Sequence, residues 1–133
     1  MSHILVIDDE QSVCRVIEAV LTAAGYTVTT APDGRSGIEA AEKQDFSVAI
    51  VDLCMPNLNG IDTIREFRAM APHMKLIAMS GLMSSSGGGN TAPDFLGMAI
   101  NLAGIPKLSK PFRRIELLDV VEQVTPKKAS DAA

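Results

Sequence analysis

Acidic or polar side chains stand at the ends of four apolar runs in this sequence. Asp8 and Asp9 follow one run, Asp52 follows a second, and Ser80 and Lys110 follow two others. Carboxylates about 5 Å apart repel each other by roughly 3 kcal/mol at an effective dielectric constant near 20, so a bound cation would stabilise such a group. Oxygen donors without histidine or cysteine favour a hard ion, which predicts Mg²⁺, or Mn²⁺ in its place.

Phosphoryl transfer to a carboxylate uses these same residue types. A metal ion and an ammonium offset the charge on the transferring oxygens while the carboxylate attacks in line. Asp52, alone at the end of its run, is the predicted nucleophile. Asp8 and Asp9 are the predicted metal ligands, whereas Lys110 and the Ser80 hydroxyl are predicted to contact the phosphoryl group.

Each of these residues also has a simpler structural interpretation. Asp9 could cap the first helix, Asp52 could end a turn, Lys110 could lie in solvent and Ser80 could begin a loop. For Asp52 or Lys110 taken singly, the structural role is the better interpretation. The agreement of four strand ends on one chemistry is what favours a joint site.

The elements that must position these residues alternate along the chain. Short apolar or β-branched runs predict five strands, and apolar residues at helical spacing predict five helices between and after them. The strands are expected at 4–7, 27–30, 48–51, 76–79 and 105–108, and the helices at 13–21, 38–43, 61–70, 94–103 and 112–124. This order predicts an α/β fold, a doubly wound parallel sheet whose sites form at the carboxyl ends of the strands.

The predicted helices also have predicted apolar faces. In chain order, the residues expected to point inward are Val13, Val16, Ile17, Val20 and Leu21, then Ile61, Ile64, Phe67 and Met70, then Ile115, Leu118, Val121 and Val124. Residues 125–133 have no apolar periodicity and are predicted to form a mobile tail.

Composition limits the classes of function. The 133 residues are 47% apolar and 21% charged, with a net charge of −4, which argues against a broad basic surface for nucleic acid or an anionic membrane. Cys14 and Cys54 are expected to be packing residues in a reducing compartment. The first residues become acidic too soon for a signal peptide, and no uncharged run is apolar enough to span a membrane, so a cytoplasmic location is expected.

Four motifs together resemble those of a known family. They are Asp8-Asp9-Glu10, Asp52-Leu53-Cys54-Met55-Pro56 through Gly60, Ser80-Gly81 and Lys110-Pro111-Phe112. In this order and at these strand ends they make residues 3–124 similar to the receiver domain of two-component response regulators. The resemblance implies a flavodoxin-like strand order of 2-1-3-4-5, with a receiver domain over 1–124 and a disordered tail over 125–133.

The resemblance also implies an activity. Asp52 would accept a phosphoryl group from a histidine kinase or phosphotransfer protein, and the domain would signal by protein contact rather than act as an enzyme. The metal would be held by Asp9, Asp52 and the backbone carbonyl of Cys54, with Asp8 acting through water. The Lys110–Pro111 bond would be cis.

The sequence departs from the family pattern in three places. Lys107 stands where the family usually has an aromatic residue that turns inward, and because burying an ammonium is costly we expect it to stay in solvent. Residues 81–93 form a long connection rich in Ser and Gly, and the helix after it carries no charge. That helix is either covered by the connection or docks a partner; 94–103 and 107–124 are the predicted surfaces for a downstream protein or self-association.

Other functions remain open from sequence alone. A degenerate receiver would only bind a partner, and a metal-dependent phosphatase that forms an aspartyl-phosphate would want a second Asp where Cys54 stands. A flavin-binding domain is disfavoured because Asp8-Asp9-Glu10 would repel a phosphate. Only nine residues follow the last predicted helix, so no output domain is expected within this sequence, whether it is a free-standing adaptor or part of a longer regulator.

Overall fold

A parallel five-stranded sheet forms the centre of the molecule. The structure is a computed structural model, and it describes residues 2–53, 60–81 and 104–125. The strand order is β2-β1-β3-β4-β5, as the resemblance implied, and every neighbouring pair is parallel, as the alternation of elements predicted. The strands are β1 (His3–Ile7), β2 (Thr27–Ala31), β3 (Val48–Asp52), β4 (Lys75–Gly81) and β5 (Lys107–Lys110).

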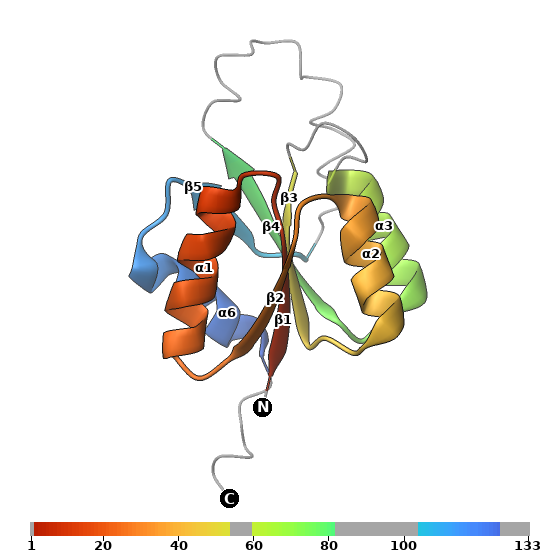
Figure 1. The fold of residues 1–133 in the computed structure, drawn as a ribbon, viewed down its shortest axis with the longest axis horizontal. Helices are drawn as coiled ribbons and strands as arrows, with labels where there is room; N and C mark the ends of the chain where they lie inside the picture. The colour runs from red at the N-terminus through yellow and green to blue at the C-terminus, as the bar shows by residue number, and fades with distance from the viewer. Residues whose placement is uncertain (1, 54–59, 82–103, 126–133) are drawn as a thin grey trace, which may run out of the picture.

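Helices cover both faces of this sheet, which makes the fold doubly wound. Those among the described residues are α1 (Gln11–Ala23), α2 (Gly34–Lys43), α3 (Gly60–Met70) and α6 (Arg114–Val124). Figure 1 shows α1 and α6 on one face and α2 and α3 on the other. The predicted helix over 94–103 lies outside the described residues, as does nearly all of the predicted tail.

The two faces of the sheet explain why residues 4–7 of β1 and 48–51 of β3 are all apolar. Ile4 and Val6 of β1 belong to the core under α1 and α6, whereas Leu5 and Ile7 belong to the core under α2 and α3. Successive side chains of a strand point to opposite faces, so a strand covered on both sides alternates between two cores. The same alternation holds in β3, where all five residues are buried.

The last two strands reach further along the chain than predicted. β4 includes Ser80, which pairs with Ser109, and Gly81, which pairs with Lys110. β5 begins at Lys107 rather than at 105. Pro106 has no N–H to donate to a ladder, so regular pairing starts after it, although its carbonyl accepts from the Ala78 N–H at 3.0 Å. Ser80, the next-to-last residue of β4, and Lys110, the last of β5, therefore belong to strands and not to loops.

The apolar faces of two helices are rotated from the predicted ones. In α6 the buried residues are Leu117, Val120 and Val121, and Ile115 is 57% exposed. A strict repeat of three drifts around a helix, whereas alternating steps of three and four stay on one face. In α1 the buried residues are Cys14, Ile17 and Leu21, and Val16 is 53% exposed.

The end of α3 also differs from its prediction. Met70, the last residue of the helix, is 36% exposed although it was expected to point inward. Met74, in the connection to β4, is buried in the core under α2 and α3, and Ala71 packs against that core. Those two residues fill the space beyond Phe67, so Met70 is left outside.

A side-chain cap sets the start of α2. Asp33 accepts a hydrogen bond from the Ser36 N–H at 2.8 Å, so the helix begins at Gly34, four residues before the predicted start. That bond lowers the pKa of the Asp33 carboxyl. Gly37 lies so close to Ile7 that a Cβ there would overlap the isoleucine side chain. The cap and the missing Cβ bring α2 directly onto the sheet.

Candidate functional site

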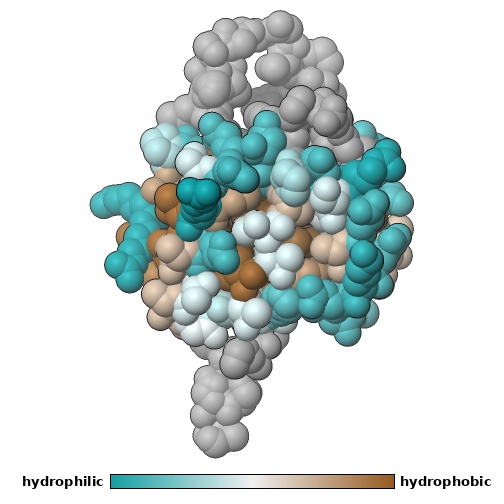
Figure 2. All heavy atoms as spheres, in the orientation of Figure 1, coloured by the Kyte–Doolittle hydropathy of each residue, from teal (hydrophilic) through white to brown (hydrophobic). Residues whose placement is uncertain are grey.

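The predicted site residues meet at one edge of the sheet. Asp8 follows β1 directly, Asp52 is the last residue of β3 and Lys110 is the last residue of β5. β1 and β3 are neighbours at the centre of the sheet, and the chain leaves them toward opposite sides, which is where sheets of this kind bind ligands. In Figure 2 hydrophilic residues gather along this upper edge of the described part.

Asp8 is held by hydrogen bonds from three directions. Its backbone N–H donates to the Ala31 carbonyl at 3.1 Å, which extends the ladder between β1 and β2 by one residue. Its Oδ1 accepts from the Glu10 N–H at 2.9 Å, and its Oδ2 accepts from Lys110 Nζ at 2.8 Å. Asp8 is only 1% exposed, so these bonds replace the water that the carboxylate loses on folding.

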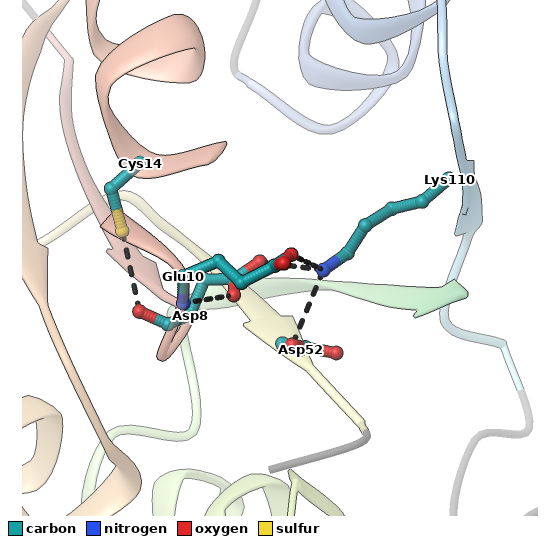
Figure 3. Close-up of polar contacts among 5 residues, drawn as sticks. All are labelled: Asp8, Glu10, Cys14, Asp52 and Lys110. Carbon is teal, nitrogen blue, oxygen red and sulfur yellow. Dashed lines mark hydrogen bonds and ion pairs between the residues drawn. The ribbon is translucent and has the colours of Figure 1, made fainter. Parts of the chain in front are cut away.

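Asp52 lies beside Asp8 and shares its cation. The side chain is buried, and its Oδ2 is 3.3 Å from Lys110 Nζ. A dashed line marks this contact in Figure 3. The next residue fixes the backbone, because the Leu53 N–H donates to the Met79 carbonyl at 2.9 Å. Asp52 therefore presents its carboxylate from a rigid strand end and not from a loop.

Lys110 carries the positive charge of the site. Burial of the ammonium lowers its pKa, but the hydrogen bond to Asp8 and the charges of Asp52 and Asp8 outweigh burial, so the pKa lies above its ordinary value. Lys110 stays protonated at neutral pH and offsets part of the carboxylate charge. The Lys110–Pro111 bond is cis, as the resemblance implied.

The carboxylates fit a divalent cation. One oxygen from each of Asp8, Asp9 and Asp52 lies within 4.8 Å of the others. Asp8 and Asp52 are buried and Asp9 is exposed, so the group opens to solvent on one side. Oxygen donors and an open side suit Mg²⁺, which keeps several of its waters. Asp9 does not cap α1, since the cap position is Glu10, so its alternative structural role is not observed.

The structure places Ser80, the fourth predicted strand-end residue, but does not describe Cys54. Ser80 lies at the same edge, because β3 pairs Asp52 with Met79 and Ser80 is the next residue of β4. The backbone carbonyl of Cys54, predicted as a metal ligand, lies outside the described residues. Lys107 is exposed, in agreement with the expectation that its ammonium stays in solvent.

Sequence reasoning gave no role in the site to Glu10 or Cys14. Glu10 Oε1 lies 3.7 Å from Lys110 Nζ, and Figure 3 shows its side chain extending over Asp8 toward the lysine. Cys14 Sγ donates to the Asp8 carbonyl at 3.4 Å, and burial, with the Asp8 charge as a second cause, raises the pKa of its thiol to about 11. Cys14 is thus an uncharged packing residue under the acidic group, as predicted. The signal for Glu10 was its place as the third acidic residue in a row.

Gly60, the last residue of the longest motif, touches the site through the backbone. A Cβ built there would overlap the carbonyl oxygen of Asp52 and lie 2.5 Å from the Cα of Leu53. No flexible side chain can move aside, because the neighbouring atoms are backbone. The first turn of α3 can pack against the end of β3 only because position 60 has no side chain.

Comparison with known proteins agrees with this geometry. The family model for the response regulator receiver domain matches residues 4–122. The chain belongs to this family. The response regulator ArlR of Staphylococcus epidermidis is 40% identical over 68 residues, which are 51% of this chain and 31% of ArlR. The uncharacterized transcriptional regulatory protein YkoG of Bacillus subtilis is 28% identical over 116 residues, 87% of this chain and 47% of YkoG.

Solved receiver structures have the same fold. The chemotaxis protein CheY4 of Vibrio cholerae superposes with a TM-score of 0.78 at 27% identity, over 93% of this receiver and 98% of CheY4. The curated relatives are longer, and this receiver spans less than half the length of ArlR or YkoG. No helix in the described part of the receiver combines the length and the apolar character needed to cross a bilayer.

Proposed function

We propose that Asp52 accepts a phosphoryl group from a histidine kinase or phosphotransfer protein and that the receiver then signals by protein contact. The observation that supports this most is the setting of Asp52: a buried carboxylate at the end of a central strand, 3.3 Å from an ammonium and beside two further carboxylates. This arrangement pairs a nucleophile with the cation that a phosphoryl group needs.

The chain's own residues would do most of the chemistry. An Asp52 carboxylate oxygen attacks phosphorus, and the bond from phosphorus to the donor nitrogen breaks with its electron pair returning to the donor imidazole. Lys110, already directed at Asp52, is placed to donate to a phosphoryl oxygen. The Ser80 hydroxyl is proposed as a second donor. The strands hold all three groups rigidly, so little reorganisation is needed when charge develops.

Asp8, Asp9 and Asp52, with the Cys54 carbonyl, are proposed to hold Mg²⁺ or Mn²⁺. The bound ion would supply positive charge next to the phosphoryl oxygens. Asp8 is also bonded to Lys110, so the same carboxylate would orient both the metal waters and the ammonium. We propose the receiver domain at 1–124 with 125–133 as its tail.

The proposed partners are proteins. A donor would reach Asp52 at the open edge of the sheet, and 94–103 with 107–124 is the proposed surface for a downstream protein or a second copy. We propose that the receiver acts in the cytoplasm, contacts neither nucleic acid nor membrane itself, and is a phosphoacceptor and not a turnover enzyme.

The test is the intact mass of the protein after incubation with a small phosphodonor such as acetyl phosphate. Wild type with Mg²⁺ should gain one phosphate, lost again in alkali as an acyl phosphate is. Asp52→Asn, and wild type in EDTA, should gain none. Asp45→Asn is the matched control, because Asp45 is exposed and precedes β3 at the opposite edge of the sheet. Stoichiometric uptake by Asp52→Asn would contradict the proposal.

A further inference from the structure

Lys110 has three acidic partners among the described residues: Asp8, Asp52 and Glu10. The proposed chemistry gives a role to the first two but none to Glu10. Its side chain is 61% exposed, yet its Oε1 lies 3.7 Å from Lys110 Nζ. Lys110 is only 17% exposed and Asp8 is fully covered, so Glu10 is the solvent-side partner of this lysine.

The local backbone accounts for this position. Glu10 is the cap residue of α1, but its side chain makes no capping hydrogen bond. Its N–H is bonded to Asp8 Oδ1 at 2.9 Å, which fixes the turn between β1 and the helix. The side chain then extends over Asp8 toward β5, as Figure 3 shows. Glu10 therefore caps α1 through its backbone only, and its side chain lies on the solvent side of Lys110.

The net charge of the site depends on Glu10. Asp8, Asp9, Asp52 and Glu10 face a single ammonium, which leaves three net negative charges without metal. A divalent ion on the three aspartates would reduce this to one. The remaining negative charge equals that of Glu10, so replacing Glu10 by glutamine would make the loaded site neutral.

We propose that Glu10 is a specificity-determining residue that selects phosphodonors by charge, disfavouring dianionic donors relative to donors with a positively charged leaving group. The inference rests on the proposed phosphorylation of Asp52. Fixed charge at the opening of a site raises or lowers the local concentration of charged ligands, and it does so less as salt increases. Glu10 also competes with an incoming phosphoryl oxygen for Lys110, and a more negative donor depends more on that ammonium.

Two small donors separate the effect of charge from other effects. Acetyl phosphate is a dianion at neutral pH; when Asp52 attacks, its P–O bond breaks and acetate leaves with the electron pair. Phosphoramidate carries a protonated nitrogen and one net negative charge; its P–N bond breaks and ammonia leaves. Both deliver the same phosphoryl group to the same oxygen, so only the donor and its charge differ.

The experiment measures the phosphorylation rate constants with both donors, in Mg²⁺, at low and high salt. Glu10→Gln should raise the rate with acetyl phosphate about fivefold more than the rate with phosphoramidate at low salt, and this difference should shrink at high salt. Glu10→Asp, which keeps the charge, should retain most of the wild-type preference. Glu122→Gln is the matched control, because it removes the same charge from an exposed position at the far end of α6 and should change neither rate.

Some outcomes would overturn the selection by charge, and one would overturn the phosphorylation of Asp52 itself. Equal changes with the two donors, or a change that salt does not reduce, would mean that Glu10 acts only by holding Lys110, and would overturn the proposed selection. No change in Glu10→Gln would overturn it as well. Failure of wild type to take up phosphate from either donor would instead overturn the proposed function itself, and with it the inference.

Discussion

Replacing Asp52 by asparagine should stabilise the metal-free protein, although it removes an ion pair. At an effective dielectric constant of about 20, the 3.3 Å contact between Lys110 Nζ and Asp52 Oδ2 contributes about 5 kcal/mol of attraction. Asp8 and Asp9 each have an oxygen within 4.8 Å of Asp52, and each repels it by at least about 3.5 kcal/mol on the same scale.

Repulsion therefore exceeds attraction by about 2 kcal/mol. Water around the exposed Asp9 weakens its share of the repulsion, whereas burial of the Asp52 charge adds a cost that asparagine avoids. We expect the free energy of unfolding of Asp52→Asn to be higher than that of wild type by about 1–3 kcal/mol.

Urea unfolding in EDTA measures this change. In a Lys110→Met background the attraction is absent, so Asp52→Asn should stabilise by a larger amount than in wild type. Asp45→Asn, at an exposed position, should change stability by no more than about 0.5 kcal/mol. An unchanged or lower midpoint for Asp52→Asn, or an equal gain in both backgrounds, would refute the electrostatic reasoning.

Three further predictions concern stability. Mg²⁺ at about 100 times its Kd should raise the free energy of unfolding of wild type by about 2.7 kcal/mol. The same Mg²⁺ concentration should raise the melting temperature of Asp52→Asn by less than it raises that of wild type. Gly60→Ala should lower the free energy of unfolding by about 1–3 kcal/mol in urea, because its Cβ overlaps the Asp52 backbone; a neutral result would contradict that packing. Asp33→Ala should cost about 1 kcal/mol at pH 7 through loss of the α2 cap. Folding lowers the pKa of Asp33, so its charge stabilises the fold at pH values above the unfolded pKa of about 3.9. This stabilisation is lost as the pH falls through the folded pKa. Asp33→Asn has no such charge, so the difference in stability between it and wild type, measured by urea unfolding, should be smaller at pH 3 than at pH 7.

The site was predictable from the sequence to the extent that strand ends determine it. Asp8, Asp52 and Lys110 end three parallel strands, and parallel strands bring their carboxyl ends to one edge of a sheet. The apolar runs before Asp8 and Asp52 are buried on both faces, which leaves little freedom for their register, whereas β5 before Lys110 has only Leu108 buried. The strand order itself came from the family resemblance, since alternation alone allows several orders.

Glu10 could not be placed in the same way. Its direction depends on the rotamers of a long exposed side chain at the cap of α1, and no periodicity in the sequence reports those rotamers. The predicted apolar faces of α1 and α6 were wrong for a different reason: both helices have more apolar residues than one face needs. Val16 and Ile115 fit a helical pattern, and only the packing of the helices on the sheet decides which residues are left outside.

Borohydride reduction can show which aspartate of the phosphorylated receiver carries the phosphoryl group, and Asp52 is the expected one. Borohydride converts a phosphorylated aspartate to homoserine, which peptide mass mapping then locates in the chain. After incubation with acetyl phosphate and Mg²⁺, we expect homoserine at position 52 and unchanged aspartate at 8 and 9. Homoserine in place of another aspartate, with position 52 unchanged, would contradict phosphorylation of Asp52.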